Sequence, residues 1–261
     1  LDLMFAWIFY KPFTMIKLIF LIRKLKPNIV HIHYPDAQIF EIFVLKKIFE
    51  FDLIISCHGN DIMQLESISK NNFKYKIFQK LLDETFLITA CSDFLKNKIL
   101  KISSRSNHNK IQTMYNGVSD RFLNKHLERE KGHYIFSIGR FVHKKGFDIL
   151  NQVSRNFTEI EFQLGGGSKE EFLQSFPVNS MKFNFLGQLT YIESFKKYSK
   201  AKVTIVPSRE EPFGIVIAEA LCSGSPIVAT NVGGIPEVIK LAKTSLTKNE
   251  KSIFNQWVKL V

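Results

Sequence analysis

The chain has 261 residues, 45% of them hydrophobic and 23% charged, which is typical of a globular protein able to bury a core without disulfide or metal support. Its 36 basic and 24 acidic residues give a formal net charge of +12, which favours anionic partners such as phosphorylated small molecules. The basic residues are not interleaved with aromatic residues in a nucleic-acid-binding motif, so we expect no nucleic-acid partner. Cys57, Cys91 and Cys222 show no paired spacing, which argues against disulfides and a zinc site and suits the cytoplasm.

The first 22 residues are mostly apolar, but Lys11, Pro12 and Lys17 interrupt them before the run reaches the ~20 apolar residues of a membrane-spanning helix. We expect a helix from about Thr14 to Lys26. Two interpretations are open: a helix packed on a sheet, which we favour, and an amphipathic helix in peripheral contact with the inner face of a membrane. No signal peptide is evident, and the first residue is Leu, so we expect the true N-terminus to be missing.

Short apolar runs alternate with helical periods along the first half of the chain. Strands are expected at 28–33, 52–57, 85–90 and 111–116. Helices are expected at about 38–49, at about 70–83 and after Ser92, which is a suitable N-cap. The polar stretch 124–132 lacks apolar periodicity and is the best linker candidate.

The same alternation restarts in the second half. Strands are expected at 133–139, 161–166, 182–187, 202–208 and 226–230. Helices are expected from about Lys145, near 169–175, near 191–199, from Gly214 and from about Ile235. Alternating strands and helices imply parallel sheets with right-handed crossovers. We therefore predict an α/β protein with two doubly wound, Rossmann-like domains, 1–128 and 129–261, and ligands at the carboxyl ends of the strands, in the crevice between the domains.

Two segments of the second half hold cations and a helix start that suit a diphosphate. A strand runs into Gly139 and Arg140, and a helix begins near Lys145, so both cations leave the same strand end. Phe213 and Gly214 then form a turn that leads at once into a helix, whose first N–H groups attract phosphate.

Carboxylates accompany this second segment. Glu211 precedes the helix and Glu219 lies on its second turn, so the two can accept hydroxyl groups from different parts of one elongated ligand. A third segment, with Gly233 and Gly234 at a strand end, brings another backbone turn to the same place.

The order and spacing of these segments resemble the motifs of the retaining glycosyltransferases of family 4, which have the GT-B fold. The resemblance covers roughly residues 20–240, and the pair Glu211 and Glu219 with Phe213-Gly214 between them is its most specific element. In the second half it rests on GRFVHKKG, FLGQLT, YSKAKVTIVPS, EEPFGIVIAEAL and NVGGIPEVI, and more loosely on LGGGSKEE. In the first half it rests on PNIVHIHYPD, SCHGNDI, ACSDFLKNKI and YNGVSDRF.

The resemblance implies a role for each matching donor-site residue. Arg140 and Lys145 are expected to hold the donor diphosphate, and Glu219 to bind the nucleotide ribose. Glu211 is expected to contact hydroxyl groups of the donor sugar. The backbone at Gly139, Phe213 and Gly214 is expected to lie beside the donor.

His58 matches a family histidine near the reacting sugar, and its position at a strand end before Gly59 supports that role. Asp61 is expected either to orient the imidazole or to cap the next helix. His31 and His33 alternate along a strand, so one of them faces the crevice, although we favour structural roles for both.

The resemblance also implies an activity: transfer of a hexose from a nucleotide-sugar donor to a saccharide or lipid-linked acceptor, with retention of configuration, in cell-envelope polysaccharide or glycolipid synthesis. Cations at Arg140 and Lys145 would stabilise the leaving diphosphate. The sequence lacks an Asp-x-Asp metal motif, so we expect neither a metal nor a cofactor.

The chain departs from the family pattern at both ends. We find no Gly-rich donor loop before residue 27 and therefore expect the first domain to lack its first strand and loop. The sequence after Ile239 matches nothing in the family. The alternative function is a noncatalytic or partner-dependent nucleotide-sugar-binding subunit, which would bind donor without transferring it. A sugar-nucleotide epimerase of the same fold fits the spacing of Glu211 and Glu219 less well.

Overall fold

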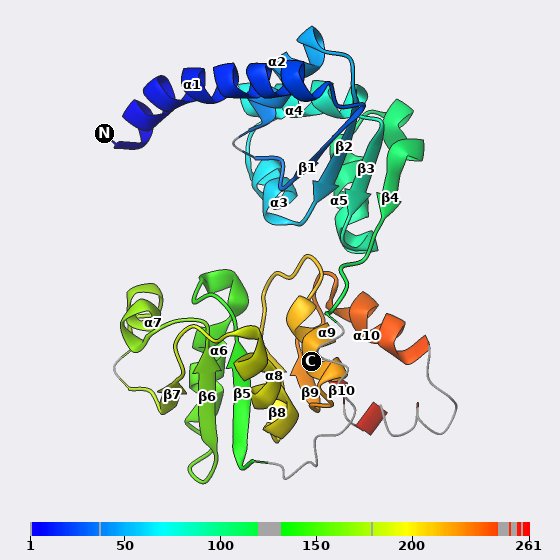
Figure 1. Cartoon of the computed structure of the whole chain (residues 1–261). Helices are drawn as coiled ribbons and strands as arrows, with labels where there is room; N and C mark the ends of the chain where they lie inside the picture. The colour runs from blue at the N-terminus through cyan, green and yellow to red at the C-terminus, as the bar shows by residue number, and fades with distance from the viewer. Residues whose placement is uncertain are drawn as a thin grey trace. The chain divides into compact units, whose positions relative to one another are not determined.

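A computed structural model of the chain describes residues 2–36, 38–119, 132–178, 180–244, 251, 255–256 and 258–261 (Figure 1). The chain divides into two compact units, unit 1 at residues 1–114 and unit 2 at residues 115–261. The predicted domain boundary at 128/129 and all but the last residue of the predicted linker lie outside the described residues.

Unit 1 contains a parallel sheet of four strands in the order β1-β2-β3-β4 (Figure 1). The strands are β1 (Ile29–His33), β2 (Asp52–Cys57), β3 (Leu87–Ala90) and β4 (Ile111–Thr113). The helices are α1 (Asp2–Leu25), α2 (Ile39–Ile48), α3 (Asn60–Ser67), α4 (Phe73–Asp83), α5 (Asp93–Ile102) and the 3-10 helix η1 (Arg105–Lys110). Because all four strands are parallel, their carboxyl ends share one edge of the sheet.

Local sequence explains most of these elements. Leu53 and Ile55 are fully buried at alternate positions of β2, as expected for a strand. The N-cap predicted at Ser92 is confirmed, since its hydroxyl accepts the backbone N–H of Leu95 at the start of α5. A helix beginning near Asp61 was one of two alternatives, but no bounds were predicted for α3, because its sequence NDIMQLES is short and mostly polar.

The predicted extent of the N-terminal helix was wrong. The helix α1 begins at Asp2, not near Thr14, and contains Pro12. A proline removes one intrahelical N–H donor, but it does not end the helix here. From residue 12 onward no side chain of α1 is fully buried, and Phe13, Ile16 and Phe20 are 63–67% exposed. No helix in the described part of the chain is long and apolar enough to cross a membrane.

Unit 2 contains a parallel sheet of six strands in the order β10-β9-β8-β5-β6-β7 (Figure 1). The strands are β5 (Tyr134–Ile138), β6 (Glu161–Gly165), β7 (Phe183–Phe185), β8 (Val203–Val206), β9 (Ile227–Ala229) and β10 (Val258–Leu260). The helices are the 3-10 helix η3 (His143–Lys145), α6 (Phe147–Ser154), α7 (Lys169–Ser175), α8 (Tyr191–Lys200), α9 (Ile215–Cys222) and α10 (Ile235–Thr244). The bounds of these strands and helices were predicted to within a few residues, except for η3 and β10, which were not predicted.

The strand order of unit 2 reverses beside β5. The chain runs outward from β5 through β6 to β7, then returns to β8 on the other side of β5 and continues to β10. This is the doubly wound arrangement, with its topological switch point between β5 and β8. The predicted α/β class with parallel, Rossmann-like sheets is confirmed.

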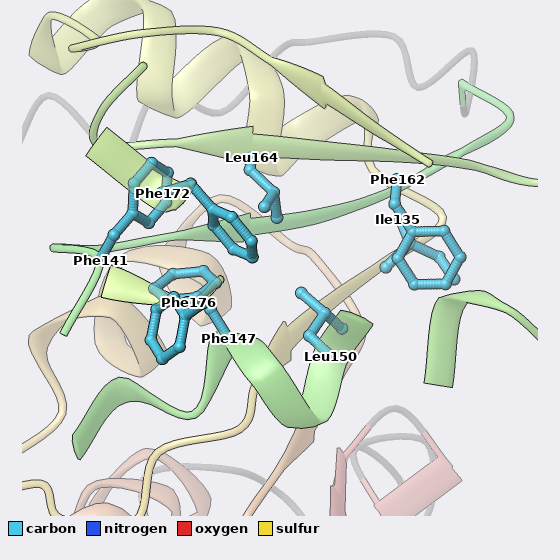
Figure 2. Packing of buried hydrophobic residues seen from close by; sticks show 8 residues of the cluster. All are labelled: Ile135, Phe141, Phe147, Leu150, Phe162, Leu164, Phe172 and Phe176. Carbon is cyan, nitrogen blue, oxygen red and sulfur yellow. The ribbon is translucent and has the colours of Figure 1, made fainter. Parts of the chain in front are cut away.

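Phenylalanine dominates the core of unit 2 on the side of β5, β6 and β7 (Figure 2). The ring of Phe141 meets Phe147 and Phe172 edge to face, with centroids 5.1 and 5.4 Å away. The cluster consists of Ile135, Phe141, Phe147, Leu150, Phe162, Leu164, Phe172 and Phe176. Since Phe141 and Phe147 lie on either side of η3 in the chain, the core holds both ends of the segment that contains Lys145.

Candidate functional site

The switch point of unit 2 lies where the loops after β5 and β8 leave the sheet. The two strands are direct neighbours, with Ile135 opposite Val203 and Phe136 opposite Thr204. In doubly wound sheets, ligands bind outside the carboxyl ends of the strands that flank this point. The loop after β5 leads through Arg140 to η3, and the loop after β8 leads to Glu211. Topology alone therefore points to these two loops.

Lys145 and Glu211, which belong to separate predicted motifs, form an ion pair. The Nζ of Lys145 lies 2.5 Å from Oε2 of Glu211, and the two side chains are 21% and 9% exposed. The hydroxyl of Ser208 contacts the same carboxylate oxygen at 3.4 Å. The pair places a cation and a hydrogen-bond acceptor side by side, which suits a ligand with both phosphate and hydroxyl groups.

Arg209 holds the two loops together. Its guanidinium donates to both carboxylate oxygens of Asp148 at 2.7 Å and to the carbonyl of His143 at 2.9 Å. Its backbone N–H also donates to the carbonyl of Lys144 at 2.8 Å. The hydrogen bond from Arg209 lowers the pKa of Asp148, so this carboxylate stays ionised. The bidentate pair thus keeps the loop of Glu211 against the turn of Lys145.

The glycines of the third motif fix the backbone of Glu211. The N–H of Gly234 donates to the carbonyl of Glu211 at 2.8 Å. Gly233 has a φ of 59°, and a Cβ built on it would lie 2.0 Å from the same carbonyl oxygen. Only glycine fits this close approach without a shift of the backbone.

The start of α9 lies next in the chain. Gly214 has a φ of 99° and precedes Ile215, the first residue of the helix, while Phe213 is buried with its ring centroid 6.3 Å from that of Tyr115. These residues are therefore positioned as a tight turn into a helix, as predicted.

Glu219 lies on the second turn of α9 and is half-buried. Its Oε2 accepts a hydrogen bond of 2.9 Å from the hydroxyl of Tyr198, which is fully buried in α8. Burial raises the pKa of Glu219, and the hydrogen bond from Tyr198 partly offsets that rise. Tyr198 thus orients the carboxylate and favours its charged form.

Gly139 and Arg140 follow β5 directly. The N–H of Gly139 donates to the carbonyl of Gly165 at 3.1 Å, and Gly166 passes so close that a Cβ there would lie 2.3 Å from the carbonyl oxygen of Gly139. The side chain of Arg140 is exposed. Among the described residues, no hydrogen bond or ion pair joins the side chain of Arg140 to Lys145 or Glu211.

The remaining predicted site residue, His58, lies in unit 1 directly after β2. Its Nε2 is 3.0 Å from Nδ1 of His33, and the ring of Tyr34 stacks on it with centroids 4.3 Å apart. Asp61 accepts the backbone N–H of His58 at 3.1 Å and that of Gly59 at 2.7 Å. The N-cap of α3 is Gly59, so Asp61 acts on the loop backbone and is not the helix cap.

Comparison with known families decides the assignment. A family model for glycosyl transferases of group 1 matches residues 118–254, more than half of the chain. The chain belongs to this glycosyltransferase family. A second family model, for glycosyltransferase family 4, matches residues 3–122, so the predicted resemblance is confirmed at the level of the family.

Relatives of this glycosyltransferase come from several kingdoms. An uncharacterized glycosyltransferase of Methanocaldococcus jannaschii is 29% identical over 217 residues, which cover 81% of this chain and 58% of the relative. Sulfoquinovosyl transferase of Arabidopsis thaliana is 23% identical over 84% of this chain and 45% of its own length. N-acetyl-alpha-D-glucosaminyl L-malate synthase of Bacillus anthracis is 24% identical over 83% and 60%. The chain thus spans about half the length of these curated relatives.

Solved structures share the fold of this glycosyltransferase. Sucrose-phosphate synthase of Thermosynechococcus elongatus superposes with a TM-score of 0.70 at 20% identity, covering 86% of this chain and 61% of its own. The Anabaena protein HepE, in complex with UDP and glucose, gives a TM-score of 0.65 at 16% identity, covering 89% and 74%. These similarities establish the GT-B fold that was predicted.

Three residues of the candidate site were missed by sequence reasoning: Tyr198, Ser208 and Arg209. Tyr198 lies in the motif YSKAKVTIVPS, where the sequence pattern indicates only an ordinary core residue of a helix. Arg209 directly precedes Glu210 and Glu211 in the sequence, but only the fold brings it to Asp148. Within the described residues, no group of three or more His, Cys, Asp or Glu side chains is arranged to hold a metal ion. The absence of a metal requirement stays a prediction.

Proposed function

We propose that the chain is the catalytic region of a glycosyltransferase that moves a sugar from a nucleotide-sugar donor to a saccharide or lipid-linked acceptor. The observation that supports this most directly is the ion pair of Lys145 and Glu211 at the switch point of unit 2. The family assignment supports the reaction class, and the UDP and glucose named with HepE support a nucleotide-sugar as the ligand class.

The donor would occupy the carboxyl end of the unit 2 sheet. Lys145 would exchange its contact with Glu211 for the diphosphate, joined by Arg140 and the helix start at Gly214. Glu211, released from Lys145, would accept hydroxyl groups of the donor sugar, and Glu219 would accept those of the ribose. These cations would also stabilise the negative charge that develops on the leaving diphosphate.

The finer features of the reaction are proposed from the resemblance of the motifs to the family. We propose transfer of a hexose with retention of configuration, with His58 in contact with the reacting sugar. The acceptor is proposed to belong to cell-envelope polysaccharide or glycolipid synthesis. Exposed Phe13 and Phe20 beside the basic Lys17 and Lys24 on α1 support a peripheral contact with an anionic membrane surface.

The substitution Glu211→Gln tests whether the chain transfers sugar or only binds it. We expect the affinity for UDP or GDP, measured by calorimetry, to stay within about threefold of the wild type, because the nucleotide does not require this carboxylate. Transfer from the sugar conjugate should fall by roughly tenfold or more, since a charged hydrogen bond to the sugar is lost.

The matched control is Glu210→Gln, which neutralises the adjacent, exposed carboxylate and should leave both quantities unchanged. Nucleotide binding by the wild type without any transfer, with oligosaccharide, lipid-linked acceptor or water, would instead favour the noncatalytic subunit. A folded wild-type chain that binds none of the nucleotides would contradict the proposal altogether.

A second variant, Tyr198→Phe, tests the ribose contact through pH. The pKa of Glu219 is already raised by burial and should rise further when the hydroxyl of Tyr198 is lost. The carboxylate would then be protonated at a higher pH than in the wild type, so nucleotide affinity should begin to fall at a higher pH as the solution is acidified. We expect a loss of roughly fivefold at mildly acidic pH, from one hydrogen bond. Superimposable pH profiles for the two proteins would argue against this role for Glu219.

A further inference from the structure

Three histidines and a tyrosine gather at the carboxyl ends of β1 and β2 in unit 1. The rings of His31 and His33 lie 4.2 Å apart, and the ring of Tyr34 stacks on that of His58. His31 is hydrogen-bonded to the hydroxyl of Ser56 at 2.7 Å, so its Nε2 is occupied within the sheet. His33 instead turns its Nδ1 to Nε2 of His58, at 3.0 Å.

The backbone around His33 is held in place against strain. Tyr34 has a φ of 52°, in the left-handed region that is unfavourable for a non-glycine residue. Its N–H donates to the carbonyl of Ser56 at 3.1 Å, and the amide of Gln38 donates to the carbonyls of Tyr34 and His33 at 2.8 and 3.2 Å. Strained backbone persists only where its surroundings hold it, and it is concentrated at functional sites. Here the strained backbone places the side chains of His33 and Tyr34 against the imidazole of His58.

A hydrogen bond between two imidazole nitrogens constrains both rings. One nitrogen must donate and the other must accept, so a proton on one ring requires a lone pair on the other. If both rings were protonated, the contact at 3.0 Å would be repulsive. The pair of His33 and His58 is therefore stable with one positive charge or none, and the tautomers of the two rings are linked.

We propose that His33 is a positioning residue for His58, which it holds through the shared proton and restricts to one tautomer, while Tyr34 holds the face of the ring. The proposal rests on the proposed function in one respect, that His58 contacts the reacting sugar. The shared proton explains why residue 33 is a histidine and not another polar residue.

The surroundings of His58 shift its pKa in opposing directions. Burial lowers its pKa most, nearby Asp61 raises it, and protonated His33 and His31 lower it. Cys91 lies under the same loop, with Sγ 3.8 Å from the carbonyl of His58. Removing His33 removes one like charge, so the pKa of His58 should rise and its titration should lose the step that is coupled to His33.

The experiment uses the whole chain with ¹⁵N-labelled histidine side chains. Long-range ¹H–¹⁵N spectra report the tautomer and the titration of each imidazole, and His58→Asn assigns the signal of His58. The test variant is His33→Asn, whose side-chain amide can replace Nδ1 as a hydrogen-bonding atom but does not titrate. The control is His108→Asn, which removes an exposed histidine of η1 in the same unit.

We expect His58 in the wild type to hold one tautomer and to titrate in two coupled steps. In His33→Asn we expect a single step at higher pH, with the tautomers mixed, while His108→Asn behaves as the wild type. In transfer assays the acid limb of kcat/KM should move to higher pH in His33→Asn alone.

A His58 signal that is identical in the wild type and in the folded His33→Asn protein would overturn the proposal. If the coupled titration collapsed as expected but no protein transferred sugar, the histidine pair would stand and the proposed function would fail. If sugar transfer occurred while the His58 signal was the same in the wild type and in His33→Asn, the proposed function would stand and the proposed histidine pair would fail.

Discussion

Replacing Lys145 with alanine should weaken binding of the nucleotide-sugar donor by at least tenfold. Two effects add in this variant. The diphosphate loses a charged hydrogen bond, worth about 1.5–3 kcal/mol. In addition, the carboxylate of Glu211, whose side chain is only 9% exposed, faces the incoming phosphates without a neighbouring cation. The measurement is titration calorimetry with UDP, GDP and their sugar conjugates.

Controls separate these two effects. Lys240→Ala removes an equal charge from an exposed position on α10 and should leave affinity unchanged. The double variant Lys145→Ala with Glu211→Gln removes the uncompensated carboxylate, so nucleotide affinity should recover in part relative to Lys145→Ala alone. The coupling energy between the two residues then follows from a double-mutant cycle. Wild-type affinity and kinetics in Lys145→Ala would refute the proposed donor site.

Sequence patterns predicted the elements of this chain better than they predicted its contacts. Strands and helices follow from local periodicity, as in α7, whose predicted bounds of 169–175 match the structure. Lys145 and Glu211 were both selected as site residues, each from its own motif. Their ion pair was not predicted, because it depends on the strand order that places β5 beside β8. The hydrogen bond from His33 to His58 likewise needs the parallel register of β1 and β2.

The errors have particular physical causes. Pro12 was expected to lie outside the helix, but a single lost hydrogen bond does not outweigh the helix on both sides of it. The helix α3 has little apolar periodicity, and the contacts of Asp61 with the loop before it are tertiary features that no local pattern contains. Arg209 was passed over because a charged loop residue usually faces solvent, whereas here it joins the loop of Glu211 to Asp148.

Gly233→Ala should impair both the stability of unit 2 and its binding of donor. At a φ of 59° an alanine costs about 1–2 kcal/mol in backbone strain alone. Its Cβ would also lie 2.0 Å from the carbonyl oxygen of Glu211, which cannot easily move because the N–H of Gly234 is bonded to it. We expect a total loss of roughly 3 kcal/mol or more in the free energy of unfolding, measured by urea denaturation.

The matched control for this substitution is Gly187→Ala. Gly187 has a φ of 68°, close to that of Gly233, but nothing lies within 4 Å of the Cβ that an alanine would add. Gly187→Ala should therefore cost only the backbone strain, about 1–2 kcal/mol, and should leave nucleotide affinity unchanged. The difference between the two variants isolates the contact with Glu211, because the strain term is common to both. If Gly233→Ala bound nucleotide as the wild type does, the third motif would have no part in placing Glu211. Loss of affinity in Gly233→Ala but not in Gly187→Ala would show that donor binding depends on the close approach of Gly233 to the backbone of Glu211.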